Sequence, residues 1–223
     1  MKRSEINRYI KEAMLFFDKH QFYLPAWTKW TPGEWAEKGE ECDEIRENQL
    51  GWDVTDFSKG DFSKEGLTLV TIRNGNVKRD NKTYCEKIMM VRENQITPIH
   101  FHWKKMEDII NRGGGALCMK LWKATPDEKL SQEPFYIQID GVRTKMNPGE
   151  VIRFYPGQSI SFEPYIYHTF WAEGEACMVG EVSTVNDDVN DNRFLEALGR
   201  FSEIEEDEPA EFLLCNEYFL KTF

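Results

Sequence analysis

Three of the four histidines form a pattern that restricts how this chain can fold. His100 and His102 are separated by one residue, Glu107 follows closely, and His168 lies far downstream. Alternate side chains of an extended strand point to the same side, so both imidazoles of an H-x-H pair can face one centre. A distant ligand reaches that centre when a sheet rolls up and closes. The pattern therefore predicts a β-barrel with a metal site, and imidazole nitrogens with one carboxylate oxygen suit Mn, Fe, Ni or Zn.

Short strand-like segments dominate the chain from about residue 66 onward. Residues 67–73 are rich in β-branched side chains and end at the turn sequence Asn74-Gly75-Asn76. Asp140-Gly141 is the strongest hairpin signal, and Glu173-Gly174-Glu175 is expected to turn a second hairpin. The other predicted strands are residues 83–91, 116–122, 135–139, 142–146, 165–171 and 176–185. Many short strands at regular spacing predict an all-β barrel or sandwich.

The segments before and after these strands are predicted to be mostly irregular. Residues 1–65 are expected to form a helix capped by Ser4 and then a tryptophan-rich arm that packs on the barrel or on a second subunit. Residues 66–185 form the barrel, and residues 186–223 form a short helix at 193–198 and a tail, all within one domain of residues 1–223. The first helix should face the core with Ile6, Ile10, Ala13, Met14 and Phe17. The arm contains Trp27, Trp30 and Trp35.

Charge and cysteine usage exclude several classes of partner. The net charge of −11 argues against a nucleic-acid surface, and the acidic run at residues 203–211 is interpreted as a solvated segment. Five scattered cysteines without a C-x-x-C pair are typical of a reducing compartment. The charged N-terminal residues fit neither a secretory signal nor a membrane span. We therefore expect a soluble cytoplasmic protein without nucleic-acid or membrane partners.

Several long segments of the chain resemble the D-lyxose isomerase family of cupins. His100-x-His102-x4-Glu107, followed by Gly113-Gly114-Gly115, resembles the first cupin motif, and Pro164-x-x-x-His168 resembles part of the second. The second motif departs from the usual form, because Gly157 lies further upstream and no asparagine follows at the expected place. Residues 100–115, 180–188, 191–195 and 214–218 resemble the isomerase family itself.

The resemblance implies a fold, a metal and a reaction. The fold would be the cupin double-sheet β-barrel (jelly-roll), with an N-terminal helix and irregular extensions at both ends. Its metal would be Mn²⁺, with Zn²⁺, Co²⁺, Ni²⁺ or Fe²⁺ as alternatives, held by His100, His102, Glu107 and His168. The reaction would interconvert D-lyxose with D-xylulose and D-mannose with D-fructose. The competing interpretation is a barrel that has lost its metal, in which these histidines only pack or lie at the surface.

Aldose–ketose isomerisation predicts roles for charged residues outside the metal site. A divalent metal would stabilise the enediolate, and a base must carry a proton between C2 and C1. Glu181 is the predicted base, expected on the strand antiparallel to the one that carries His168. Its alternative role is a charge paired with a lysine. Lys87 and Lys105 are predicted to contact substrate oxygens or transfer protons, although Lys87 could instead extend to the surface.

A second group of polar residues is predicted to recognise hydroxyl groups or to hold a lid. These residues are Asp187, Asp188 and Arg193. The dense run of Asn and Asp at residues 186–192 is equally well explained as a loop and a helix cap.

Two other functions remain open from the sequence. A cupin with these ligands could be an iron dioxygenase that uses O₂, or a sugar-binding cupin without catalysis. An isomerase needs a charged cavity, whereas an oxygenase for an apolar substrate does not. We also expect a homodimer, because the tryptophan-rich arm offers a surface for a second subunit.

Overall fold

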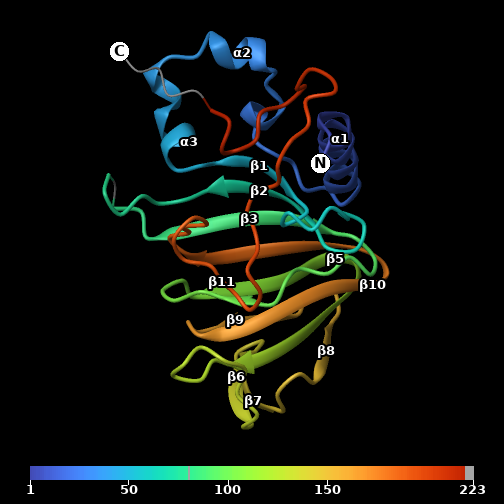
Figure 1. Ribbon diagram of the computed structural model, residues 1–223, viewed down its shortest axis with the longest axis vertical. Helices are drawn as coiled ribbons and strands as arrows, with labels where there is room; N and C mark the ends of the chain where they lie inside the picture. Colours follow the sequence, from blue (N-terminus) through green and yellow to red (C-terminus); the bar gives the residue numbers. More distant parts are fainter. Residues whose placement is uncertain (80, 219–223) are drawn as a thin grey trace.

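Antiparallel strands are the main regular structure in the computed structural model, which describes residues 1–79 and 81–218. The helices gather at one end of the molecule beside β1, and the β6–β7 hairpin lies at the other end (Figure 1). The strands are β1 (Gly51–Thr55), β2 (Leu67–Arg73), β3 (Tyr84–Val91), β4 (His100–Phe101), β5 (Glu107–Lys123), β6 (Phe135–Ile139), β7 (Val142–Met146), β8 (Val151–Phe154), β9 (Ser159–Phe162), β10 (Ile166–Thr184) and β11 (Arg193–Phe194). The helices are α1 (Arg3–Lys19), α2 (Pro32–Ala36) and α3 (Asp43–Glu47), with 3-10 turns at Ala26–Lys29 and Glu40–Cys42.

Two long strands, β5 and β10, form the centre of the barrel. They pair with each other along most of their length, and each continues from one half of the barrel into the other. One half of β10 pairs with β3 and the other half meets β4, while β5 pairs with β9 near its start and with β8 near its end. The main path runs β1-β2-β3-β10-β5-β9-β6-β7. The predicted β-barrel is confirmed, with its core inside the curve of these strands.

The hairpin predicted at Glu173-Gly174-Glu175 is wrong, because this sequence lies inside β10. The β5–β10 ladder loses its register between Glu173 and Cys177 and then continues in the same direction. Opposite this irregularity, Gly113 and Gly114 have positive φ angles of 155° and 86° within β5. A side chain on Gly114 would collide with the carbonyl oxygen of Ala176. The glycines therefore allow two bent strands to approach closely, rather than reversing the chain.

Helix α1 packs its apolar side against the outer face of the sheet near β1, β2 and β3. Ile6, Ile10, Ala13 and Phe17 are fully buried, as predicted, and they join a cluster that includes Trp52. The helix begins at Arg3 after Lys2, so the prediction of Ser4 as its cap is wrong. In the described part of the chain, no helix has the length and hydrophobicity needed to cross a lipid bilayer.

The tryptophan-rich arm packs on its own chain. Trp35 is buried against Trp30 and Tyr218, with ring centroids 5.0 Å and 4.7 Å away. The Trp52 indole donates a hydrogen bond to the Thr28 carbonyl at 2.8 Å. Residues 51–55 were predicted to belong to this arm, but they form β1 at the edge of the sheet.

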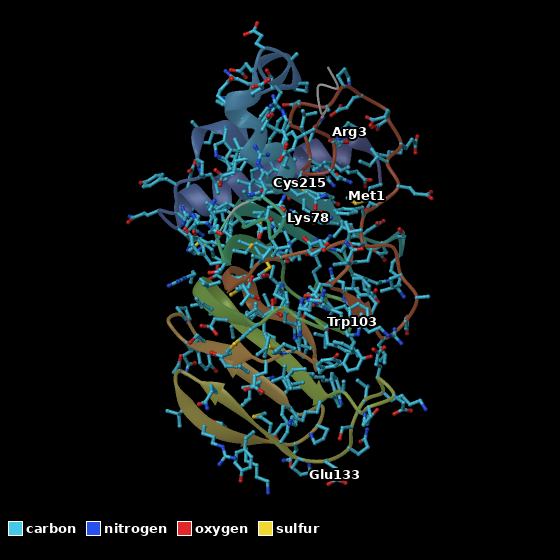
Figure 2. The ribbon with its side chains drawn as sticks, turned by 90° about the vertical axis from the view of Figure 1, so that its left-hand side faces the viewer. Met1, Arg3, Lys78, Trp103, Glu133 and Cys215 are labelled. Carbon is cyan, nitrogen blue, oxygen red and sulfur yellow. The ribbon has the colours of Figure 1, made fainter. Side chains whose placement is uncertain are left out.

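The acidic segment 203–211 runs beside α1 and is tied to it. Arg3 is 2% exposed and pairs with Glu206 and Glu217, and Lys11 pairs with Glu211 at 2.6 Å. Figure 2 places Met1, Arg3 and Cys215 at the same end of the molecule. The acidic side chains of this segment are exposed, as predicted for a solvated segment, and some of them also form ion pairs with α1.

The helix predicted at residues 193–198 is also wrong. Arg193 and Phe194 form β11, which pairs with β4, and the Leu195 amide donates to the Ile99 carbonyl at 2.9 Å. The short strand β4 leaves backbone groups that need partners, and the ladder with β11 satisfies them.

We predict that Gly114→Ala will destabilise the barrel by roughly 3 kcal/mol, because it adds a steric clash to an unfavourable backbone conformation. Gly141→Ala is the matched control, since Gly141 has a φ of 78° but no atom within 4 Å of an added side chain. The control should lose about 1 kcal/mol. Urea unfolding measures both, and equal losses would contradict the close approach of β5 and β10.

Candidate active site

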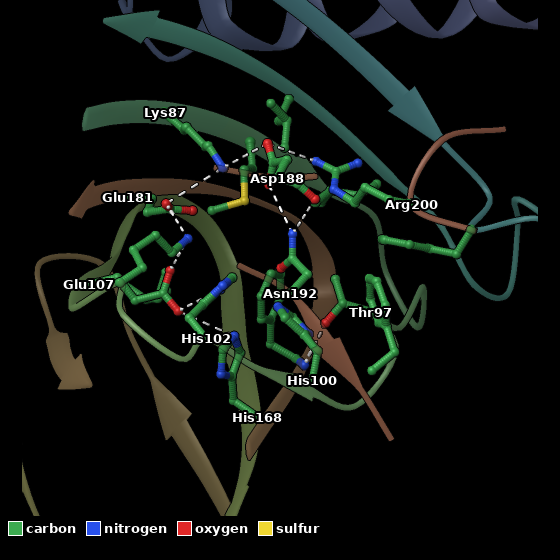
Figure 3. A pocket seen from close by; sticks show the side chains of 18 residues that line it. Lys87, Thr97, His100, His102, Glu107, His168, Glu181, Asp188, Asn192 and Arg200 are labelled. Atoms are coloured by element: carbon green, nitrogen blue, oxygen red, sulfur yellow. Dashed lines mark hydrogen bonds and ion pairs between the residues drawn. The ribbon is translucent and has the colours of Figure 1, made fainter. Parts of the chain in front are cut away.

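A polar pocket opens inside the barrel, and every predicted metal ligand lines it (Figure 3). The cavity has a volume of about 50 Å³. Its polar lining is formed by Lys87, Thr97, His100, His102, Lys105, Glu107, His168, Glu181, Asp188, Asn192 and Arg200. Its apolar lining comes from Phe57, Leu67, Leu69, Met89, Ile109, Phe170 and Phe194. The site is therefore a charged centre with an apolar wall on β2 and β3.

The three predicted histidine ligands converge on one point. Their ligand nitrogens lie within 4.8 Å of one another. His100 on β4 faces His168 on β10 in the strand ladder, and His102 follows β4 directly. The pairing of a two-residue strand with the long central strand thus brings residues far apart in sequence together.

Backbone carbonyls orient all three imidazole rings. The Nδ1 atoms of His100, His102 and His168 lie 2.8, 2.6 and 3.1 Å from the carbonyl oxygens of Pro98, Asp191 and Ile166. Since a carbonyl only accepts, each Nδ1 donates its proton and each Nε2 keeps a lone pair. Burial lowers the pKa of each histidine below its usual value, which favours the neutral, ligating form.

Glu107 completes the donor set. Its Oε1 lies 3.5 Å from His102 Nε2 and 3.4 Å from His168 Nε2. This oxygen is buried and accepts no hydrogen bond from the residues that the structure describes. Burial alone would raise the pKa of Glu107, but Lys105, 2.7 Å from Oε2, outweighs it and lowers the pKa to about 2. A buried carboxylate oxygen beside imidazole lone pairs fits a divalent transition metal.

A chain of alternating charges extends from Glu107 across the pocket. Lys105 Nζ lies 2.7 Å from Glu107 Oε2 and 2.8 Å from Glu181 Oε1. Lys87 Nζ lies 3.7 Å from the same Glu181 oxygen and 3.5 Å from Asp188 Oδ2. Burial alone would lower the pKa of each lysine, but the surrounding carboxylates reverse the effect and raise it. Both lysines therefore point into the cavity as ammonium groups, and Lys87 does not extend to the surface.

Glu181 lies on β10, the strand that also carries His168, so its predicted place on a neighbouring antiparallel strand is wrong. Thirteen residues separate His168 from Glu181, an odd number that would put them on opposite faces of a regular strand. Their partners on β5, Leu121 and Ile109, are twelve residues apart. Because of the register shifts, the segment of β10 between these two pairs is one residue longer than the paired segment of β5. Glu181 therefore faces the inside of the barrel, as His168 does.

The three residues predicted to recognise substrate have different surroundings. Asp188 lines the pocket, where its Oδ2 accepts a hydrogen bond from the Asn186 amide at 2.9 Å. Asp187 instead accepts hydrogen bonds from Asn190 and stabilises the loop. Arg193 points away and donates to Glu128 at 2.9 Å. The structure does not bring Asp187 or Arg193 to the pocket.

The buried Asp191 and the half-buried Arg200 belong to the site but were not predicted from the sequence. Asp191 accepts hydrogen bonds from the Lys104 and Lys105 amides, both at 2.9 Å, while its own carbonyl holds His102. Arg200 reaches the pocket from the irregular C-terminal segment and lies 3.3 Å from Asp188. Only the run of Asn and Asp at residues 186–192, which precedes Arg200, could have suggested such a pairing.

Comparisons with known proteins agree on one family. The family model described as D-lyxose isomerase matches residues 1–218. Two proteins named D-lyxose/D-mannose isomerase, from Escherichia coli O157:H7 and Serratia proteamaculans, are each 47% identical over 98% of this chain and 98% of their own length. Among solved structures, the L-ribose isomerase of Geodermatophilus obscurus superposes with a TM-score of 0.62 at 16% identity, over 92% of this chain and 98% of its own. The Cellulomonas parahominis L-ribose isomerase with L-ribose gives 0.59 at 17%, with the same coverage. These two structures support the fold.

We predict that His168→Ala and Glu107→Gln will each weaken Mn²⁺ binding more than the roughly 10- to 100-fold loss typical of residues that only support a ligand. His20→Ala is the control, because His20 ends helix α1 and does not line the pocket. Metal analysis after dialysis and calorimetric titration with Mn²⁺ measure the effect. Unchanged metal content in both site variants would disprove the ligand assignment.

Proposed function

Because this chain belongs to the D-lyxose isomerase family, we propose that its pocket interconverts D-lyxose with D-xylulose and D-mannose with D-fructose. The protein is an aldose–ketose isomerase. The observation that carries the proposed mechanism is the placement of the Glu181 carboxylate next to Glu107, with Lys105 between them. This arrangement puts a proton acceptor and an ammonium donor beside the proposed metal ligands.

His100, His102, Glu107 and His168 would hold the metal, and we propose Mn²⁺ as the native ion. Zn²⁺, Co²⁺, Ni²⁺ and Fe²⁺ suit the same donors. When bound, a divalent ion supplies positive charge that polarises the substrate carbonyl. The carbonyls that hold each Nδ1 keep the three rings oriented for this role.

Glu181 is the proposed base, which removes the C2 proton and returns it to C1. Both lysines approach the same oxygen, Oε1. The other oxygen, Oε2, is the one that we assign to the substrate proton. Glu181 is 5% exposed, so water competes little for the transferred proton. Its alternative role as a simple ion-pair partner is compatible with this one, because the pairing orients the carboxylate.

Lys105 and Lys87 are proposed to donate hydrogen bonds to substrate oxygens. Lys105 lies between two carboxylates, so its ammonium group can stabilise negative charge that develops on the sugar during proton transfer. Lys87 donates to the Asn186 amide oxygen at 2.8 Å and lies near Asp188. We assign Lys87 and Asp188 to the hydroxyl groups further from the metal ligands.

The family match and the charged pocket favour the isomerase over the two alternatives. A dioxygenase would not need Glu181 and two lysines in the cavity, and a binding protein would not need a proton carrier. The expected homodimer and cytoplasmic location remain proposals. Light scattering of the purified protein tests the homodimer. The cytoplasmic location is supported by the five cysteines, which are all buried and unpaired, as expected in a reducing compartment.

We predict that Glu181→Gln will lower kcat for D-mannose by roughly 10³-fold, because it removes the proton acceptor. Its metal content should stay unchanged, and exchange of the C2 proton with D₂O, followed by NMR, should disappear. Glu173→Gln is the control on the same strand, since Glu173 pairs with Arg153 at the surface. Retention of proton exchange in the Glu181 variant would rule out Glu181 as the base.

We expect EDTA to abolish ketose formation and Mn²⁺ to restore it, because a divalent ion carries more positive charge than any single side chain that lines the pocket. The restored activity should be the same under argon as in air. A panel of aldoses and divalent ions, assayed for ketose, also tests the proposed substrates and metal. Conversion of mannose by metal-free protein, or loss of activity under argon, would contradict the proposed reaction.

A further inference from the structure

We propose that Asp53, which does not line the pocket, is a positioning residue that holds Arg200 ready to bind the sugar. This inference rests on the proposed function. Asp53 lies on β1, at the edge of the sheet, and is 3% exposed. Its cross-strand partner is Leu69 on β2, which lines the pocket, so Asp53 points to the same inner face.

A buried carboxylate at this place needs a cationic partner, and Arg200 provides it. Arg200 Nη2 lies 2.6 Å from Asp53 Oδ2 and 3.3 Å from Asp188 Oδ2. The guanidinium group is thus held between one carboxylate behind the pocket and one in its lining. Both acidic residues contact the same nitrogen, Nη2.

The second terminal nitrogen of Arg200 has a hydrogen bond left to donate. Nη1 is buried and has no hydrogen-bond partner within residues 1–79 and 81–218. A buried donor without a partner is unfavourable unless a ligand or water satisfies it. Sugar hydroxyl groups are acceptors of suitable size, and Arg200 lies in the pocket lining beside Asp188, the acidic residue that we assign to the sugar (Figure 3).

Arg200 depends on Asp53 for its orientation because its own segment has no regular structure. Its backbone is held through the carbonyl, which accepts a hydrogen bond from Thr55 Oγ1 at 2.9 Å. This bond fixes the main chain but leaves the long side chain free to rotate. Without Asp53, the guanidinium group would keep a contact with the Phe201 ring, 5.0 Å from its centroid, and the ion pair with Asp188, which is shared with Lys87 and Asn186.

The decisive experiment is a double-mutant cycle between Asp53→Asn and Arg200→Met, assayed with Mn²⁺-loaded protein and D-mannose. We expect Asp53→Asn to raise KM about tenfold, as for the loss of a close buried ion pair, with a smaller change in kcat. Adding it to Arg200→Met should cause no further loss, since the partner through which it acts is already absent. Metal content should equal that of the wild type.

A purely structural role for Asp53 predicts different results. Asp53→Asn would then lower the melting temperature and the active fraction, leave KM unchanged, and add its full effect to that of Arg200→Met; this outcome overturns the inference. Asp43→Asn is the matched control, because Asp43 pairs with the buried Arg46 at 2.9 Å away from the pocket and should leave KM unchanged. If Asp53→Asn does not fold, Asp53→Glu, which keeps the charge but displaces it, is measured in the same cycle.

Calorimetric binding of D-mannose separates this inference from the proposed function. A wild-type protein that binds D-mannose without turnover would overturn the isomerase mechanism, while the Kd values of the same variants still decide the role of Asp53. Turnover in the wild type with unchanged KM and Kd in Asp53→Asn would overturn the inference alone.

Discussion

The pairing of β5 with β10 determines both the barrel and its site. Two strands of this length can join both halves of a barrel only if they bend, and the bend occurs where Gly113 and Gly114 meet the register shift of β10. The extra residue in β10 changes which side chains face inward. As a result, one strand carries His168 at one end and Glu181 at the other, both directed into the same cavity.

The charges in that cavity stabilise one another as a group. Burying a single ion is costly, and an isolated buried ion pair often gives no net stability. Here Lys105 contacts two carboxylates, and Arg200 likewise contacts two. The surrounding carboxylates raise the pKa of Lys87, Lys105 and Arg200, so these three groups stay charged inside the barrel, where apolar side chains would be less costly to bury. Such conflict between stability and chemistry is expected at catalytic sites.

The sequence predicted the parts of the molecule that follow local rules. The turn at Asp140-Gly141 joins β6 and β7 as expected, and the ligand pattern around His100 identified the centre of the site. The sequence could not distinguish a glycine that reverses the chain from a glycine that bends a strand, because the difference depends on the residues that pack against the glycine. Residues 173–175 were therefore assigned to a turn.

Site residues that are far in sequence from the histidine motif could not be predicted for a similar reason. Arg200 has neither periodicity nor a motif, and only the folding of the C-terminal segment over β1 brings it beside Asp53. In contrast, Arg193 and Asp187 stood in a suggestive polar run, but a β11 ladder and a loop hydrogen bond direct them elsewhere.

The attachment of the C-terminal segment to β1 and α1 has a consequence for the order of assembly. The proposed metal ligands lie between residues 100 and 168, whereas Arg200 and the acidic residues bound to Arg3 come later in the chain. Ribosomes release the chain from its N-terminus, and contacts between distant segments form slowly. All four proposed metal ligands are therefore synthesised before Asp188 and Arg200, the last of the charged residues that line the pocket. The pocket is complete only when the C-terminal segment packs on β1 and α1.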